Sequence, residues 1–291
     1  MKKESRRSIL KRMAAGSSLM LGATLPLSAE NQAGPLNLKG RINHSVCRWT
    51  YNSLTLDQLC QAVKDIGFSA IDLIPPSGWP TLKKYGIHCS MCNGEEINIP
   101  DGWNEPKNHE KLIKEYAALI PQVAEGGYKN LICFSGNRRG MDDVTGMKNC
   151  ITGLKNIMPL AEKHGVMIIM ELLNSKVDHK DYMCDKSGWG VELCKQLGSP
   201  NFKLLYDIYH MQIDEGDIIR TIKANYQYFG HYHTGGNPGR HEIDDTQEIY
   251  YPAVMRAIVE TGYKGHVAQE FIPVREDKLA SLRQAVALCD V

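Results

Sequence analysis

Short apolar runs recur along the chain, and several of them end in a polar residue. Most of the runs are solid rather than alternating, which is typical of strands covered on both faces of a parallel sheet. We expect eight strands, over residues 42–47, 70–74, 87–92, 131–134, 166–171, 202–207, 229–233 and 266–270.

Helix-forming segments fill the intervals between these runs. We expect helices over 56–66, 81–85, 109–125, 142–164, 189–197, 217–228, 251–261 and 277–288. Gly67 and the pair Gly126–Gly127 each follow one of them, where glycine commonly ends a helix. Eight strand–helix units after residue 42 predict an α/β fold, the (β/α)8 TIM barrel. No GxGxxG motif follows the first strand, which argues against a dinucleotide-binding sheet.

Four consecutive runs end in a residue that can bind a cation. These residues are Glu171, Asp207, His233 and Glu270, and the intervals of 36, 26 and 37 residues each fit about one strand–helix unit. The carboxyl ends of barrel strands meet at one face, so we expect the four side chains to converge there. Any one of them alone is more often a loop ion pair, but the succession of four favours a divalent metal site. Oxygen-rich ligation with one imidazole suits Mn²⁺ best, with Mg²⁺ or Co²⁺ as alternatives.

The first 29 residues differ from the rest of the chain. Residues 5–11, Ser-Arg-Arg-Ser-Ile-Leu-Lys, resemble the twin-arginine export signal, and a modestly apolar stretch leads to Ser28 and Ala29. The alternative is an amphipathic helix or a membrane anchor, but Gly, Ser, Thr and Pro residues interrupt the stretch too often for a stable span. We expect a signal peptide over 1–29, a linker over 30–41 and a single barrel domain over 42–291. The expected location is the periplasm, with no stable membrane anchor.

Charge and cysteine content argue against a nucleic-acid-binding protein and against a disulfide-rich protein. Six of the 34 basic residues and one of the 33 acidic residues lie in the first 29 positions, so the remaining 262 residues carry a formal charge of −4. No basic face results, and we expect no nucleic-acid partner. The nine Cys lie mostly in apolar runs, as buried small side chains do, rather than in a disulfide framework. Cys89 and Cys92 have CxxC spacing, but an offset of three on a strand points two thiols to opposite faces.

Motifs around the four strand ends resemble the xylose-isomerase-like barrel superfamily. Residues 170–174 (MELLN), 206–212 (YDIYHMQ), 231–242 (HYHTGGNPGRHE) and 268–271 (AQEF) are similar to the hydroxypyruvate isomerase and ketose 3-epimerase group. Residues 238–242 resemble the hydroxypyruvate isomerase branch most. That branch often has Gln at the position of His233, whereas the epimerases have His.

The resemblance implies that the four strand-end residues hold the metal. It also implies that Glu171 and Glu270 act as acid and base, and that His210 and Arg240 contact substrate oxygens. An α-hydroxy carbonyl compound can chelate a divalent metal, and a carboxylate can then remove a carbon-bound proton. Returning the proton to the adjacent carbon isomerises the substrate, and returning it to the other face of the same carbon epimerises it.

Several polar residues near the strand ends have competing structural interpretations. A surface position on a Gly-rich loop is the alternative for Arg240, and a satisfied structural histidine is the alternative for His210. Weaker candidates, for which we expect packing, solvated-loop or loop-holding roles, are Trp49, Trp103, Lys176, His179, His241 and Glu242.

Three functions from different classes remain. The first is a divalent-metal-dependent isomerase or epimerase of sugars or hydroxy-keto acids, acting by proton transfer through a metal-bound enediolate. The second is an exported lyase or hydrolase of 3-keto-glycosides with the same metal site. The third is an endonuclease of this superfamily, which needs several metals and a basic groove; a noncatalytic sugar-binding barrel would not need both Glu171 and Glu270. The expected partner is a small-molecule substrate, and the expected assembly is a homodimer or homotetramer.

Overall fold

The computed structural model describes residues 34–291, and residues 35–291 form one compact unit. The predicted signal peptide, residues 1–29, lies outside the described residues. Part of the predicted linker contacts the barrel, since Leu36 N donates to Ile66 O at 2.7 Å and Lys39 N donates to Asp290 Oδ2 at 2.7 Å. Among residues 34–291, no helix combines the length and the apolar character needed to cross a membrane.

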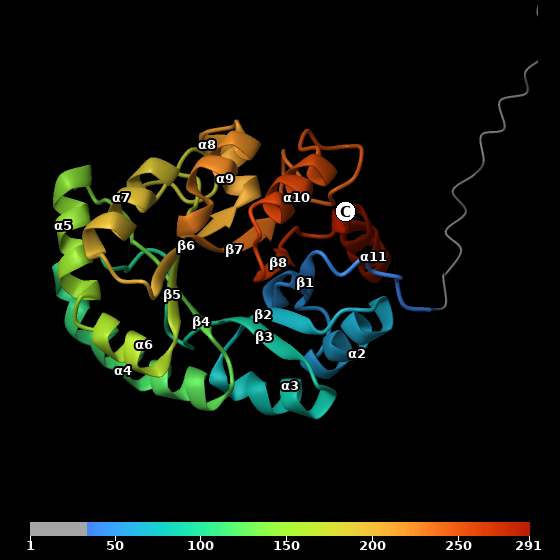
Figure 1. The fold of residues 1–291 in the computed structure, drawn as a ribbon, viewed down its shortest axis with the longest axis horizontal. Coiled ribbons are helices and arrows are strands. Elements are labelled where there is room, and N and C mark those ends of the chain that lie inside the picture. The colour runs from blue at the N-terminus through green and yellow to red at the C-terminus, as the bar shows by residue number, and fades with distance from the viewer. Residues whose placement is uncertain (1–33) are drawn as a thin grey trace, which may run out of the picture. The chain divides into compact units, whose positions relative to one another are not determined.

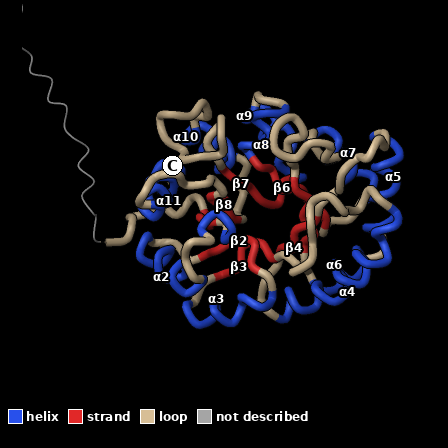
Figure 2. The backbone as a smooth tube through the Cα atoms, turned by 180° about the vertical axis from the view of Figure 1, so that it is seen from behind, coloured by secondary structure: helices blue, strands red, loops and turns tan. Residues whose placement is uncertain are grey.

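Eight parallel strands lie at the centre of this unit, with helices around them (Figure 2). They pair in the order β1-β8-β7-β6-β5-β4-β3-β2, and a parallel bridge between Cys47 and Asp72 links the two ends of this order. The strands are β1 (Asn43–Val46), β2 (Ala70–Ile74), β3 (His88–Cys92), β4 (Asn130–Cys133), β5 (Met167–Glu171), β6 (Phe202–Asp207), β7 (Phe229–Thr234) and β8 (His266–Gln269). The predicted (β/α)8 TIM barrel is confirmed.

The helices form the outer layer (Figure 1). They are α2 (Leu56–Ile66), α3 (Trp79–Tyr85), α4 (His109–Glu125), α5 (Asp143–Leu154), α6 (Met158–His164), α7 (Ser187–Leu197), α8 (Ile208–Asp214), α9 (Ile218–Asn225), α10 (Tyr251–Glu260) and α11 (Lys278–Cys289). Short 3₁₀ turns connect some elements: η2 (Arg48–Tyr51), η3 (Pro76–Gly78), η4 (Pro106–Asn108) and η5 (Tyr226–Tyr228).

Local signals fix the bounds of α2, which are those predicted from the sequence. Gln58 N donates to the Thr55 hydroxyl at 3.2 Å, and Thr55 N donates to the Gln58 side chain at 2.8 Å, which forms a capping box. Gly67 ends the helix with φ of 114°, a left-handed conformation that side chains with a Cβ disfavour.

Two helical predictions are wrong in detail. The single helix expected over 142–164 is divided into α5 and α6, and Pro159 lies in the first turn of α6, where a residue without an N–H is best tolerated. Helix α8 was not predicted. It begins directly after β6, and the Asp207 side chain caps it by accepting from Tyr209 N at 2.8 Å and His210 N at 3.2 Å.

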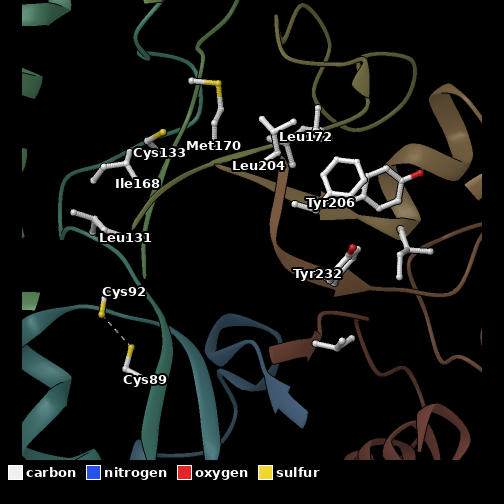
Figure 3. Packing of buried hydrophobic residues seen from close by; sticks show 14 of the residues in the cluster. Cys89, Cys92, Leu131, Cys133, Ile168, Met170, Leu172, Leu204, Tyr206 and Tyr232 are labelled. Carbon is white, nitrogen blue, oxygen red and sulfur yellow. Dashed lines mark hydrogen bonds between the residues drawn. The ribbon is translucent and has the colours of Figure 1, made fainter. Parts of the chain in front are cut away.

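Alternate strand residues belong to two apolar clusters. Ile168 of β5 joins the large cluster that strands and helices share (Figure 3), whereas the next residue, Ile169, packs with Met91, Ile132 and Leu205. The second cluster draws its fully buried members from strands alone, as expected for side chains that fill a barrel interior. This period of two is the reason that the strand sequences read as solid apolar runs.

The thiols of Cys89 and Cys92 do not point apart as predicted. Their sulfur atoms lie 3.5 Å from each other (Figure 3). The reason is an irregular register between β2 and β3, where Ile71 pairs with Cys89 but the next residue, Asp72, pairs with Met91. Such a shift breaks strict alternation. All nine cysteines are free and buried, in agreement with the prediction.

Candidate metal centre and catalytic site

The structure brings the four predicted metal ligands together at the carboxyl ends of four neighbouring strands. Glu171 and Asp207 end β5 and β6, His233 lies one residue before the end of β7, and Glu270 directly follows β8. One ligand atom from each residue lies within 4.8 Å of the other three, and all four residues are buried. These four side chains, spread over 99 positions of the sequence, converge because their strands run parallel. Their role as metal ligands stays a prediction.

The imidazole of His233 lies between the two glutamates. Its Nδ1 atom is hydrogen-bonded to Glu270 Oε2 at 2.8 Å and lies 3.1 Å from Glu171 Oε1. The geometry favours the bond to Glu270, so Glu171 Oε1 is left buried without a hydrogen-bond partner. Asp207 Oδ1 is used in capping α8, which leaves its Oδ2 to face the cluster.

This donor set fits a divalent cation. Three buried carboxylates around one imidazole repel one another unless protons or a cation neutralise them, because burial removes the screening by water. A buried carboxylate oxygen without a partner, as at Glu171, is a costly feature that a bound cation would satisfy. Oxygen ligands with one imidazole suit the hard divalent ions expected from the sequence.

The carboxylates differ in how readily they hold a proton. Burial raises the pKa of Asp207 to about 8, and burial also raises the pKa of Glu171. Burial opposes ionisation of Glu270 as well, but the charges of His233 and Arg240 outweigh it and bring the pKa of Glu270 well below its usual range. Glu270 is therefore the ionised member of the group, and Glu171 more readily carries a proton.

Arg240 lies inside the cluster and not on the surface. Its Nη2 atom lies 3.2 Å from Asp207 Oδ2 and contacts Glu270 Oε2, and its side chain is 11% exposed. The guanidinium carbon lies 5.2 Å from the Trp49 ring centre and 5.3 Å from that of Tyr209, so two aromatic rings flank the cation. The surface alternative weighed for Arg240 is thus wrong. Its contact with substrate stays a prediction.

His210 is fully buried beside the same cluster. Its Nδ1 atom accepts from Asn174 Nδ2 at 2.6 Å, and its Nε2 atom lies 3.6 Å from Asp207 Oδ2 without a hydrogen-bond partner. Burial, with Arg240 nearby, lowers the pKa of His210 well below its usual range. A neutral His210 with Nδ1 as acceptor carries its proton on Nε2, which is an unpartnered donor next to the candidate ligands.

Trp49 has a different role from the packing role predicted. It is 38% exposed, and its indole N–H donates to Glu270 Oε1 at 2.7 Å. Its position three residues after the end of β1, at the same face of the barrel as the other strand ends, was the available signal. The solvated-loop prediction for His179 is also wrong, because this residue lines the cavity beside Glu171.

Two weaker candidates have the structural roles expected. Glu242 Oε1 accepts from Val274 N at 3.0 Å, Arg275 N at 3.1 Å and the Ser281 hydroxyl at 2.9 Å, so it holds the loop that follows β8. Trp103 is fully buried and packs in the core. Both predictions are confirmed.

A cavity of about 540 Å³ opens beside Glu171 and Glu270. Arg240, His179 and Trp49 supply further polar or aromatic parts of its wall. The apolar part of the wall consists of Leu73, Ile97, Ile99, Ile132, Phe134 and Leu173. A cavity with a few convergent polar groups and a large apolar wall is typical of an enzyme's substrate site.

Comparisons with known proteins agree with this picture. The family model of the xylose isomerase-like TIM barrel matches residues 60–288. The putative hydroxypyruvate isomerase of Drosophila melanogaster is 34% identical over 217 residues, covering 71% of this chain and 82% of that protein. The 2-oxo-tetronate isomerase of Cupriavidus necator is 34% identical over 113 residues, covering 39% of this chain and 43% of that protein.

Similarity to solved structures is in the fold. The crystal structure of the 3-keto-D-glucoside 4-epimerase of E. coli superposes with a TM-score of 0.73 at 16% identity, covering 85% of this chain and 98% of that chain. The Drosophila and Cupriavidus proteins are named isomerases, and they confirm the enzyme class expected from the sequence.

Proposed function

Because the chain belongs to the xylose isomerase-like TIM barrel family, we propose that it isomerises or epimerises a hydroxy-carbonyl compound by proton transfer between Glu171, Glu270 and the substrate. The observation that carries this proposal is the pair of glutamates on either side of one imidazole, next to a cavity. Two carboxylates at one substrate can serve as acid and base in either direction.

The two glutamates differ in their hydrogen bonds, which suits different roles. Glu270 is held at both oxygens, by Trp49 on Oε1 and by His233 and Arg240 on Oε2. Glu171 Oε1 is without a hydrogen-bond partner, and Glu171 lines the cavity. We therefore assign to the Glu171 carboxylate the exchange of the carbon-bound proton, and to Glu270 the role of the fixed carboxylate on the other side.

Glu171, Asp207, His233 and Glu270 would hold one divalent ion, with Mn²⁺ the expected species, and the ion when bound polarises the substrate carbonyl. The neutral His210 offers its Nε2 proton to a substrate oxygen. Arg240, flanked by Trp49 and Tyr209, is positioned to orient a second oxygen by a charge-assisted hydrogen bond.

The cavity favours a substrate larger than a three-carbon acid. Its volume of about 540 Å³ lies in the range of sites that enclose drug-sized ligands, and such a site would leave a three-carbon acid surrounded mostly by water. The apolar wall also suits a substrate with an uncharged portion. This observation supports a ketohexose, and it keeps 3-keto-glycosides as the second candidate substrate, with a lyase or hydrolase acting through the same residues.

Incubation with candidate substrates in D₂O tests the proposal. Protein prepared without residues 1–29 and supplied with Mn²⁺ is mixed with hydroxypyruvate, ketohexoses or 3-keto-glucosides, and products are followed by NMR. We expect turnover of a ketohexose or a 3-keto-glucoside, with deuterium entering at the carbon next to the carbonyl. Product without any deuterium would indicate a hydride shift and reject proton transfer by the two glutamates.

We also propose that the protein is exported to the periplasm, on the basis of residues 5–11. Recognition of a twin-arginine signal depends on the arginine pair. Replacing Arg6 and Arg7 together by Lys keeps the charge, and we expect it to leave uncleaved precursor in the cytoplasm. Cell fractionation followed by immunoblotting measures this, with the unchanged chain as control. Unaltered export of the double variant would contradict the proposal.

A further inference from the structure

A buried carboxylate on β2 lies behind the candidate metal centre. Asp72 is fully buried, and its Oδ2 atom lies 2.9 Å from His233 Nε2 and 3.0 Å from His231 Nε2. Its other oxygen, Oδ1, accepts from the hydroxyl groups of Ser90 and Ser45. Asp72 does not line the cavity itself. It contacts His233, the only imidazole among the four candidate ligands.

An irregular backbone places Asp72 there. The register between β2 and β3 shifts on both sides of Asp72, and the next residue, Leu73, has φ of +59°, which non-glycine residues rarely adopt. Asp72 therefore reaches the histidines while its neighbour Leu73 lines the cavity. A backbone conformation this costly in free energy is found mostly at functional sites.

The contacts of Asp72 decide which nitrogen of His233 carries a proton. A carboxylate accepts hydrogen bonds and cannot donate them, so an Nε2 atom at 2.9 Å must be the donor. His233 Nδ1 donates in the same way to the ionised Glu270 at 2.8 Å, so it carries a proton as well. A cation must displace this proton, since a coordinating imidazole is neutral, and Asp72 then keeps the remaining proton on Nε2 and leaves the lone pair on Nδ1. This atom is the one that faces Glu171 and Glu270.

We propose that Asp72 is a positioning residue that holds the His233 proton on Nε2 and so presents Nδ1 to the divalent cation. The inference rests on the proposed metal site. The remaining neighbour of His233 Nε2 is the Cys47 sulfur at 3.7 Å, which is a weak partner. His231 donates to the same oxygen of Asp72, and the serine hydroxyls bind the other, so the carboxylate is fixed in orientation.

The alternative is a second cation bound by Asp72, His231 and His233, whose ligand atoms also lie close together. The two nitrogen–oxygen distances are those of N–H···O hydrogen bonds, and Ser90 and Ser45 occupy the remaining carboxylate oxygen. The hydrogen bonds that Asp72 already accepts therefore favour the positioning role over that of a ligand.

Asp72→Ala tests the proposal by removing the acceptor. The proton of His233 should then move to Nδ1, where Glu270 and Glu171 accept it and where it competes with the cation. Loss of outer-shell partners lowers metal affinity by roughly 10–100-fold, and we expect a loss in this range for Mn²⁺ by calorimetric titration. Asp244→Ala is the matched control, because it removes another buried carboxylate, which pairs with Arg275 outside the candidate ligand cluster, and its affinity should stay close to that of the parent.

A double-mutant cycle separates positioning from simple charge. If Asp72 acts through His233, Asp72→Ala should have no further effect in a His233→Ala background, with the weaker binding measured by electron paramagnetic resonance at millimolar Mn²⁺. An equal loss in both backgrounds would overturn the proposal in favour of a long-range charge effect. Two ions per chain in the parent and one in Asp72→Ala would overturn it in favour of the second cation.

The parent protein supplies a readout that does not depend on folding of a variant. With ¹⁵N-labelled histidine and Mg²⁺ bound, we expect His233 to show a proton on Nε2 and none on Nδ1. A proton on Nδ1 would overturn the inference. A parent that binds no divalent ion contradicts the metal site itself, whereas a parent that binds one ion while Asp72→Ala binds it equally well contradicts only the role of Asp72.

Discussion

Replacement of Asp207 or His233 by Ala is expected to abolish high-affinity binding of the divalent metal. Each side chain offers one of the four candidate ligand atoms, and both residues are buried. Removing a direct ligand should cost more than the roughly 10–100-fold typical of outer-shell partners, so we expect a loss above roughly 100-fold for Mn²⁺. Elemental analysis and calorimetric titration of protein prepared without residues 1–29 measure this directly.

Asp207 requires a second variant, because its side chain also caps α8. Asn is as good an N-cap as Asp, whereas Ala in place of a capping residue costs about 0.5–2 kcal/mol of stability. Asp207→Asn should therefore lose metal affinity without this loss of stability, and Asp207→Ala should lose both. Added Mn²⁺ should raise the Tm of the parent, because it binds the folded state, and should not raise that of these variants.

Asp244→Asn and His44→Gln are suitable controls. Both residues are buried, but Asp244 pairs with Arg275 and His44 lies 3.5 Å from Asp290, outside the candidate ligand cluster. Their metal content should equal that of the parent. If Asp207→Ala and His233→Ala bind metal as well as the parent does, the ligand set is misassigned.

Glu171→Gln is expected to lower kcat by roughly 10²–10⁴-fold, the contribution typical of a general acid or base. The amide keeps the shape of the side chain but cannot accept the carbon-bound proton. Since Glu171 Oε1 makes no hydrogen bond, the substitution disturbs few contacts. Turnover of the accepted substrate at saturating Mn²⁺, together with deuterium uptake from D₂O, provides the measurement.

Glu270→Gln should lose at least as much activity as Glu171→Gln, because it removes a carboxylate and also disturbs neighbouring residues. An amide nitrogen at the position of Oε2 faces the Arg240 guanidinium and His233 Nδ1, so the variant also disturbs the orientation of both residues. Glu260→Gln, an exposed residue paired with Lys223, is the control and should retain parental kcat. Near-parental activity of Glu171→Gln would reject the assignment of Glu171 as a proton-transfer group.

Much of the fold was predictable because its signals are local. The capping box of Thr55 and Gln58 with Gly67 determines α2, and the bounds predicted for β2 and β6 agree with the structure. Helix α8 was missed because five of its seven residues are buried, so its sequence lacks the polar face that identifies a helix. A capping Asp at the end of a strand was the signal available for it.

The sequence by itself determined the barrel and the convergence of Glu171, Asp207, His233 and Glu270. Parallel strands that each end in a polar residue must present these residues at one face, whatever the details of packing. Composition and spacing were therefore sufficient to predict the candidate ligand set and the class of cation expected there.

Only the tertiary structure decided which residues surround these four. Trp49 bonds to Glu270 across 221 positions, and Asp72 bonds to His233 across 161 positions. Both contacts exist because the sheet closes into a barrel, which brings β1 and β2 close to β7 and β8. The contact of Asp72 with His233 also depends on the irregular register beside Leu73. Neither closure nor register leaves a local pattern in the chain, since both arise from packing of the whole barrel.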